Sequence, residues 1–531
     1  MFTILKGLDL DGPGKMIKAK SSGPITVLIS LLLVLWVFKT LGPHASNNTV
    51  LTPEAAFEKG KKLYLLYCAG CHGENGDGNG KAAEYLYPKP RDFTRGLFKI
   101  RTTPSGSLPT DEDLLKVVSQ GMYGSGMPNF KFLNSDEKNA LIQYIKTFSE
   151  AFQYRQPEPS VVVGKEPSVS VKTIEVGKKI YAKMECAKCH GEKGKGDGPS
   201  ANNLKDDWQV SIKVRDFTTG IYKGGPTNKD LYLRFTSGMN GTPMPAYVGE
   251  LMTDQERWYL VHYVQSLRTQ TPIVYSPPEE AFIKSLKAKG EIPLIPESKM
   301  WNKASFFEIP VFPLWQTDHP VTGVKVKTIH NNQEIAFLLE WSDPTCDTSF
   351  NKVQDFRDAV ALQYSLTEEV GALAMGDKDH PVNIWHWKAD WQSDLSRKFV
   401  LEKFYPNLHT DFYWFQDDPN QLKTYLTGQG AGNLFSQAER FSSVEDLNAK
   451  GFGTLSPQSL KAQNVKGTGT WVNGVWKVIF IRSLNSKDGG DIKFSKDKRI
   501  PFAFSIWDGS QNDRDGQKYF SSWYYLQLAD K

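Results

Sequence analysis

Two copies of one five-residue motif carry most of the chemistry open to this chain of 531 residues. They read Cys68-Ala69-Gly70-Cys71-His72 and Cys186-Ala187-Lys188-Cys189-His190. In C-x-x-C-H, the two thiols are spaced to form thioethers with the two vinyl groups of a haem, and the histidine can ligate the iron. The sequence therefore predicts two covalent c-type haems, with His72 and His190 as iron ligands.

A second iron ligand is expected on a loop facing each histidine, because a soft thioether there raises the reduction potential of a haem. Each copy offers two methionines. Met127 and Met244 stand in Met-Pro pairs, in which proline stiffens the turn, and they are the predicted ligands. Met122 and Met239 are expected to pack against the haem.

The two motifs occupy equivalent positions in an internal repeat. Gly60–Tyr64 matches Gly177–Tyr181 before the cysteines, and each copy closes with an amphipathic helix. The offset is 118 residues at Cys68/Cys186 and 117 at Met127/Met244, so the register holds throughout. Each unit resembles a small class I cytochrome c domain. We expect two all-α domains of this kind, over 52–152 and 172–270.

One arginine recurs in the repeat, as Arg91 and Arg215. A guanidinium forms a bidentate pair with a carboxylate, so each arginine is a candidate partner for haem propionates. A solvated loop arginine is the alternative, and the sequence leaves both readings open.

The N-terminus predicts a membrane anchor. Four lysines precede a run without charge from Ile25 to Phe38, and with Leu41 the apolar stretch reaches about seventeen residues, near the lower limit for a membrane span. An uncleaved transmembrane helix within 1–45 is favoured over a signal peptide. The lysines then place the rest of the chain on the periplasmic side of a bacterial inner membrane.

Composition narrows the remaining possibilities. The net charge of +5 gives no case for nucleic-acid binding, and the length implies three or four domains. The leftover cysteine, Cys346, is expected to be a small buried filler. A proline-rich and charged segment, 271–300, is predicted to be a linker. Beyond it, alternating strands and an Asn473-Gly474 hairpin signal predict an antiparallel β-sandwich over 301–531.

Several phrases of this C-terminal half resemble the haem-b-binding gamma subunit of ethylbenzene dehydrogenase and its relatives, which include nitrite oxidoreductase. The phrases are Phe356–Gln363, Met375-Gly376, Pro381–Asp390, Gly451–Thr454 and Phe502–Gly509.

The resemblance implies one b haem between the two sheets, held by a methionine and a lysine. It maps the methionine onto Met375. A ligating lysine must be neutral and therefore desolvated. Lys450, beside Gly451-Phe452-Gly453, is the first choice. The alternatives left open are Lys461, Lys466 and Lys518, with His380 and His386 as possible replacements for either ligand.

The expected function is electron transfer without catalysis, because six-coordinate haems bind no substrate. The resemblance implies a molybdenum catalytic subunit and an iron–sulfur subunit as partners, and a soluble cytochrome or membrane respiratory complex beyond them. Nitrite oxidation or nitrate reduction is the expected chemistry of the whole complex. The alternatives are a dihaem cytochrome whose sandwich binds a ligand or protein without haem, and an enzyme with an open haem site.

Overall fold

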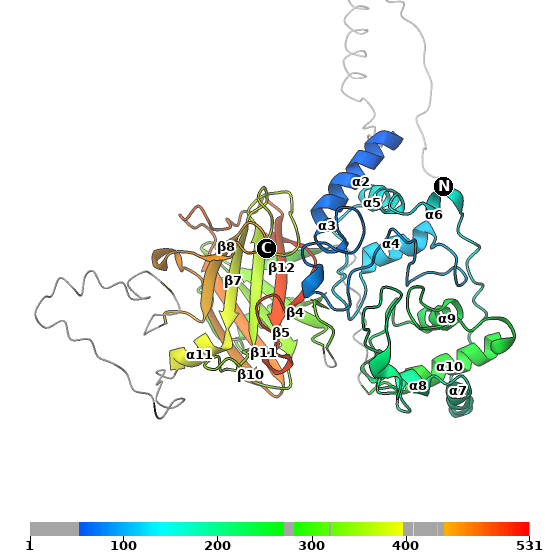
Figure 1. The fold of residues 1–531 in the computed structure, drawn as a ribbon. Helices are drawn as coiled ribbons and strands as arrows, with labels where there is room; N and C mark the ends of the chain where they lie inside the picture. The colour runs from blue at the N-terminus through cyan, green and yellow to red at the C-terminus, as the bar shows by residue number, and fades with distance from the viewer. Residues whose placement is uncertain are drawn as a thin grey trace, which may run out of the picture. The chain divides into compact units, whose positions relative to one another are not determined.

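The computed structural model describes residues 52–269, 281–317, 320–396, 407, 433 and 440–529. The described chain begins with two helical units and continues into a β-rich half (Figure 1). The α-helices of the first unit are α2 (Pro53–Tyr67), α3 (Ala69–His72), α4 (Asp111–Gln120), α5 (Ser135–Lys146) and α6 (Ala151–Tyr154). Those of the second are α7 (Val171–Lys183), α8 (Ala187–His190), α9 (Asn228–Ser237) and α10 (Asp254–Ser266).

Equivalent helices of the two units begin with equivalent caps. Thr110 starts α4 and Thr227 starts α9, and each side chain accepts a hydrogen bond from the backbone N–H of an aspartate three residues on. The aspartate carboxylate bonds back to the cap N–H, which satisfies a second unpaired donor of the first turn.

A glycine lets the first and last helices of each unit cross closely. A Cβ on Gly60 in α2 would lie 2.2 Å from the carbonyl oxygen of Ala140 in α5. A Cβ on Gly177 in α7 would lie 2.0 Å from the carbonyl oxygen of Tyr259 in α10. The short helices α3 and α8, which carry the C-x-x-C-H motifs, follow directly from these crossing helices.

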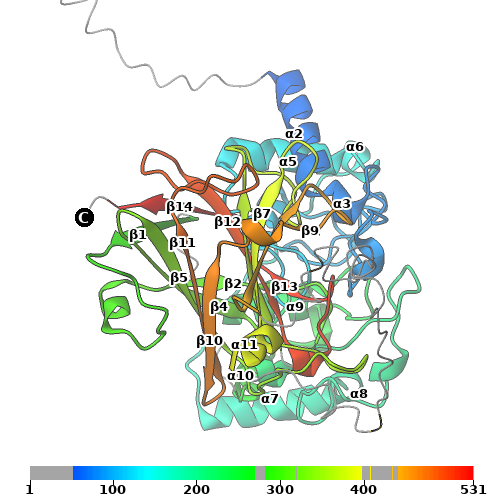
Figure 2. The same cartoon turned by 90° about the vertical axis from the view of Figure 1, so that its left-hand side faces the viewer.

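The β-rich half forms one continuous run of strands, which Figure 2 shows from a second side. Their order is β10-β11-β5-β4-β1-β14-β12-β6-β7-β8-β9. The bounds are β1 (Phe282–Lys287), β2 (Phe307–Pro310), β3 (Phe312–Pro313), β4 (Gly323–His330), β5 (Glu334–Ser342), β6 (Ala359–Ser365), β7 (Val382–Lys388), β8 (Val444–Ala449), β9 (Ser456–Pro457), β10 (Lys466–Val472), β11 (Val475–Ser483), β12 (Ile500–Trp507), β13 (Tyr519–Phe520) and β14 (Tyr524–Leu528). Helix α11 (Ala389–Ser396) follows β7.

Aromatic side chains fill the space between the two layers of this sandwich. Phe337 of β5 meets Tyr364 of β6 at a ring-centroid distance of 5.9 Å and Trp385 of β7 at 6.1 Å. All three belong to one buried cluster, and none is exposed to solvent. The inner faces of the sheets are therefore closely packed.

The predicted fold class needs correction at the N-terminus. Among the described residues no helix has the length and apolar character to cross a bilayer. The longest of them, α2, has 15 residues, whereas a span needs about 20. The segment 25–41, on which the prediction fell, lies outside the described residues. The transmembrane helix and the inner-membrane location that rested on it are withdrawn.

The sheet is mixed, so the prediction of a purely antiparallel sandwich is also wrong. Strand β1 runs parallel to both of its neighbours, β14 and β4. It lies inside the segment 271–300 that was predicted to be a linker. Because β1 enters from a distant unit and not through a hairpin, no tight turn imposes antiparallel pairing. A smaller correction concerns Cys346, which is exposed.

Candidate functional site

The first motif presents a neutral imidazole to a cavity. Ring Nδ1–H of His72 donates to the carbonyl oxygen of Arg91 over 2.8 Å, and the ring stacks on Phe93 at 4.5 Å. Burial lowers the pKa of His72 to about 4, so the ring is uncharged at neutral pH. Its Nε2 is thereby oriented as a ligand, and Cys68 and Cys71 line the same cavity.

The predicted methionine ligand of the first unit lines this cavity with His72, and Met122 does so too. A short backbone bridge fixes the loop, since the N–H of Met122 donates to the carbonyl oxygen of Met127 over 2.9 Å. Gly121 precedes the bridge with φ of 72°, and a Cβ there would lie 2.7 Å from the Met127 oxygen. The geometry brings Met127 and Met122 together and leaves the choice between them to experiment.

The second unit repeats this arrangement. His190 stacks on Phe217 at 4.3 Å, and burial lowers its pKa to about 4. Tyr181 donates its hydroxyl hydrogen to the carbonyl oxygen of Gly191, as Tyr64 does to that of Gly73. Met244 packs in the same hydrophobic cluster as Cys186.

The recurring arginines cross between the two units in a reciprocal way. A Cβ on Gly241 of the second unit would lie 2.6 Å from Nη1 of Arg91, and a Cβ on Gly124 of the first would lie 2.7 Å from Nη1 of Arg215. Nη2 of Arg215 also donates to the carbonyl oxygen of Gly124 over 2.9 Å. Each arginine therefore packs on the methionine loop of the opposite unit.

Two lysines complete a basic group with these arginines. Burial, together with the positive charge of Arg91, lowers the pKa of Lys99 to about 7. Lys223 sits at the equivalent place of the second unit, and burial together with Lys99, Arg215 and Arg91 holds its pKa well below the usual value. Nη1 of Arg91 is buried and finds no hydrogen-bond acceptor among the described residues. The group fits carboxylates of bound haems.

The cavity of the first unit continues onto the outer face of the sandwich. Alternate residues of β6 and β12 point there, and three of them are alanines: Ala359, Ala361 and Ala503. The intervening residues of β6 point into the aromatic core. The small side chains leave a cavity of about 670 Å³ that is shared by the first helical unit and the sandwich. The predicted location between the sheets is thus filled with aromatic rings instead.

Met375 is held at this cavity by its backbone. It adopts the left-handed conformation, with φ of 63°, which is costly for a residue with a side chain. Gln363 of β6 stabilises the turn, because its Oε1 accepts from the N–H of Met375 over 3.0 Å and its Nε2 donates to the carbonyl oxygen of Leu373. The N–H of Gly451 donates to the carbonyl oxygen of Met375. The Met375 side chain lines the cavity.

Of the candidate lysines, Lys518 is the one that lines the cavity. Burial lowers the pKa of Lys518 to about 8, and its ammonium lies 5.0 Å from the centre of the Trp507 ring. Lys450, the first choice from the sequence, is exposed, as are Lys461 and Lys466. Met375 and Lys518 therefore line the same cavity, whereas Lys450 is exposed and lies outside the cavity lining.

The two candidate histidines have different surroundings. Nδ1 of His380 lies 2.8 Å from Oδ1 of Asp377, so this ring is engaged outside the cavity lining. His386 lines the cavity and stacks on Trp507 at 4.7 Å. Its Nε2 is buried and has no hydrogen-bond partner among the described residues. The cavity is thus lined by an unpaired imidazole nitrogen of His386, the thioether of Met375 and the amine of Lys518. This set of donors fits a metal-bearing group.

Comparisons with known proteins agree with this division of the chain. The family model for ethylbenzene dehydrogenase matches residues 298–519, and that for cytochrome c matches 57–149 and 174–268. A protein of Haloferax mediterranei described as a respiratory nitrate reductase heme subunit is 24% identical over 48% of this chain and 74% of its own length. The gamma subunit of chlorate reductase from Ideonella dechloratans is 21% identical over 48% of this chain and 87% of its own length.

A solved structure, the reducing HAO-like protein complex of Kuenenia stuttgartiensis, contains a chain that is 52% identical over 41% of this chain and 99% of its own length. The TM-score of this match is 0.40. The chain thus belongs to the cytochrome c family over residues 57–149 and 174–268 and to the ethylbenzene dehydrogenase family over residues 298–519.

Proposed function

We propose that this chain is the haem-bearing electron-transfer subunit of a molybdenum oxidoreductase, with two c haems and one b haem. Haems supply one-electron redox chemistry when bound. One observation carries the proposal: a single apolar cavity is lined both by Cys68, Cys71, His72 and Met127 and by Met375 and Lys518.

The residues of the chain have distinct tasks in this proposal. The four motif cysteines attach the c haems, and His72 and His190 ligate from one side while Met127 and Met244 ligate from the other. Met375 and Lys518 hold the b haem. A buried lysine suits this task because desolvation favours the neutral amine that a metal requires.

The proposed partners are a molybdenum catalytic subunit and an iron–sulfur subunit, with a respiratory cytochrome or complex as the further electron partner. Similarity to haem subunits of nitrate and chlorate reductases supports oxyanion chemistry in the complex. Within that class we propose the nitrite–nitrate couple. Co-purification of this chain with a molybdenum protein that interconverts nitrite and nitrate tests this part.

The haem content of the full chain tests the core of the proposal. After extraction with acidified organic solvent, two haems should stay on the polypeptide and one should appear in the solvent. Cys71→Ala and Cys189→Ala should each remove one covalent haem and leave the extractable one. Met375→Ala should do the reverse.

Carbon monoxide provides a control for catalysis. If all three irons are six-coordinate, the reduced protein should show little spectral change on adding carbon monoxide. Strong binding by the wild type would favour an enzyme with an open haem site. Protein without extractable haem would favour the ligand-binding sandwich.

A further inference from the structure

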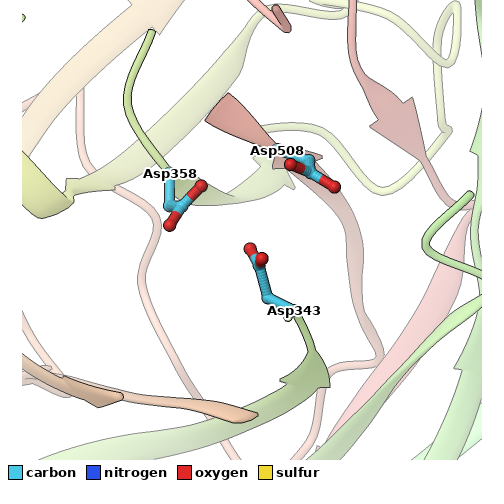
Figure 3. A group of neighbouring side chains, drawn as sticks. All are labelled: Asp343, Asp358 and Asp508. Carbon is cyan, nitrogen blue, oxygen red and sulfur yellow. The ribbon is translucent and has the colours of Figure 1, made fainter. Parts of the chain in front are cut away.

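Three buried aspartates from distant parts of the sequence meet at one edge of the sandwich. Asp343 follows β5, Asp358 precedes β6 and Asp508 follows β12. One carboxylate oxygen of each lies within 4.8 Å of one from each of the others, and all three side chains are buried (Figure 3). None of the three is part of the haem site proposed above.

The trio lacks a cationic partner among the described residues, where no ion pair involves any of the three. A second buried acidic pair in this domain, Asp446 and Asp491, differs in this respect. Nη1 of Arg482 lies 3.4 Å from Oδ1 of Asp491, and both side chains are buried. Buried charges are normally paired with an opposite charge or bound to a metal. Because the trio has no ion pair among the described residues, its charge must be compensated in another way.

One carboxylate oxygen of the trio has no hydrogen-bond partner among the described residues. Oδ1 of Asp343 accepts hydrogen bonds from the backbone N–H and the hydroxyl of Thr345. Oδ2 of Asp343 is fully buried, and no donor among the described residues bonds to it. Figure 3 shows the Asp343 carboxylate directed toward the gap between Asp358 and Asp508. A bound cation would satisfy a buried acceptor that has no donor in this position.

We propose that Asp343, Asp358 and Asp508 form a binding site for one Ca²⁺ ion. Oxygen-only donors select hard cations, and Ca²⁺ binds carboxylates at roughly 2.3–2.6 Å. Two oxygens on opposite sides of such an ion lie about 4.6–5.2 Å apart, and the oxygens of the trio lie within 4.8 Å of one another, so one ion can contact all three. Mg²⁺ loses its bound waters reluctantly and is usually held by one or two carboxylates with several waters, so three buried carboxylates favour Ca²⁺.

Hydrogen bonds from neighbouring groups fix the orientation of the carboxylates of the trio. Asp358 accepts from the backbone N–H groups of Asp347 and Gly509 and from Nε1 of Trp476, which orients its carboxylate. Without a cation, burial and the neighbouring carboxylates raise the pKa of Asp343 to about 6 and that of Asp358 to about 8. Protonated carboxyls are therefore the rival form of compensation, and only the metal site predicts that added Ca²⁺ stabilises the protein.

The test uses the full haem-loaded chain. Elemental analysis should find one Ca²⁺ per chain after dialysis in Ca²⁺-free buffer, and none after treatment with EGTA. Returning Ca²⁺ to 100 times its Kd should raise the Tm of the stripped protein by about 5–10 °C. Asp343→Asn and Asp508→Asn should each abolish both the bound metal and the Ca²⁺-dependent rise.

Asp491→Asn is the matched control, since it also removes one buried carboxylate of the same domain. It should lower the Tm but keep the bound Ca²⁺ and the Ca²⁺-dependent rise. A merely structural Asp343 would make Asp343→Asn less stable in EGTA as well. The metal site predicts instead that this variant equals or exceeds the wild type in EGTA, because it loses one repulsive charge.

The proposal is overturned if wild-type protein binds no Ca²⁺ and its Tm stays constant up to about 10 mM Ca²⁺, well above the Kd of weak extracellular sites. It is equally overturned if bound Ca²⁺ survives both aspartate substitutions. Neither outcome depends on how many haems the chain carries, so this test is separate from that of the proposed function.

Discussion

At the scale of single residues, the choice of lysine separates two readings of the haem site. Lys518 lines the cavity with Met375, whereas Lys450 is exposed. Lys518→Ala should therefore reduce the extractable haem to well below half of the wild-type amount, or leave an iron that binds carbon monoxide. Lys450→Ala, a change of the same size, should leave the content and the spectrum of the extractable haem unaltered. Both variants are measured by solvent extraction and by the spectrum with carbon monoxide. The reverse result would restore Lys450 as the ligand.

The two methionines of the first unit call for a similar comparison. Met127→His should lower the potential of one covalent haem by a sizeable part of the roughly 0.8 V range that axial ligands span, because imidazole stabilises ferric iron more than a thioether does. Met122→Leu should cost less than about 1.5 kcal/mol of stability and leave the potential near its original value. Potentiometric titration followed by absorbance distinguishes the two. An unchanged titration for Met127→His would identify Met122 or another group as the ligand.

At the residue scale, the sequence supports a prediction where chemistry imposes a local spacing. The thiols and histidine of C-x-x-C-H are adjacent in the chain, so their meeting at a cavity needed no knowledge of the fold. A ligating lysine has no such local signature. Its requirement is burial, and burial of Lys518 arises from the folding of distant strands around it. The exposed position of Lys450 was hidden from the sequence for the same reason.

At the scale of elements, neighbouring side chains of strand β6 point to opposite faces of the sheet and therefore have different roles. Ala361 points to the cavity and Val360 points to the aromatic core. Ala361→Leu should occupy haem space, so the extractable haem should be lost while both covalent haems stay. Val360→Leu adds volume on the other face and should cost about 1–3 kcal/mol of stability but keep the extractable haem. Haem extraction and chemical denaturation measure the two effects. Loss of haem only in Val360→Leu would place the haem between the sheets.

The elements themselves were predictable to different degrees. Asn473-Gly474 forms the turn between β10 and β11 as its sequence indicates, with φ of 52° and 77°. Strand β1 was not predicted, because a charged stretch after a proline-rich segment is typical of a linker. No hairpin turn in the sequence indicates which strands pair with it. Its pairing with β14 joins residues more than 200 positions apart, which local patterns do not encode.

At the scale of the whole chain, the first helical unit and the sandwich share more than a cavity. The hydroxyl of Tyr67 donates to the carbonyl oxygen of Val370 over 2.8 Å, and the backbones of Tyr87 and Gln316 are joined by a hydrogen bond. Phe132 packs against clusters of both parts. The first helical unit and the sandwich thus form a composite cavity that neither part forms alone.

The proposed Ca²⁺ site bears on this environment, because its aspartates border loops that line the cavity. Arg357, directly before Asp358, and Lys518, ten residues after Asp508, both face the cavity. If both proposals hold, removal of Ca²⁺ should make the loops that carry Arg357 and Lys518 less ordered and weaken binding of the non-covalent haem. Incubation with EGTA and apomyoglobin, which captures released haem, should therefore remove the extractable haem several times faster than incubation with Ca²⁺ present. The covalent haems should be unaffected, and the Asp491→Asn protein should respond to EGTA as the wild type does. Equal release rates after confirmed loss of the metal would limit the ion to a local stabilising role, since the cavity wall would then stand without it.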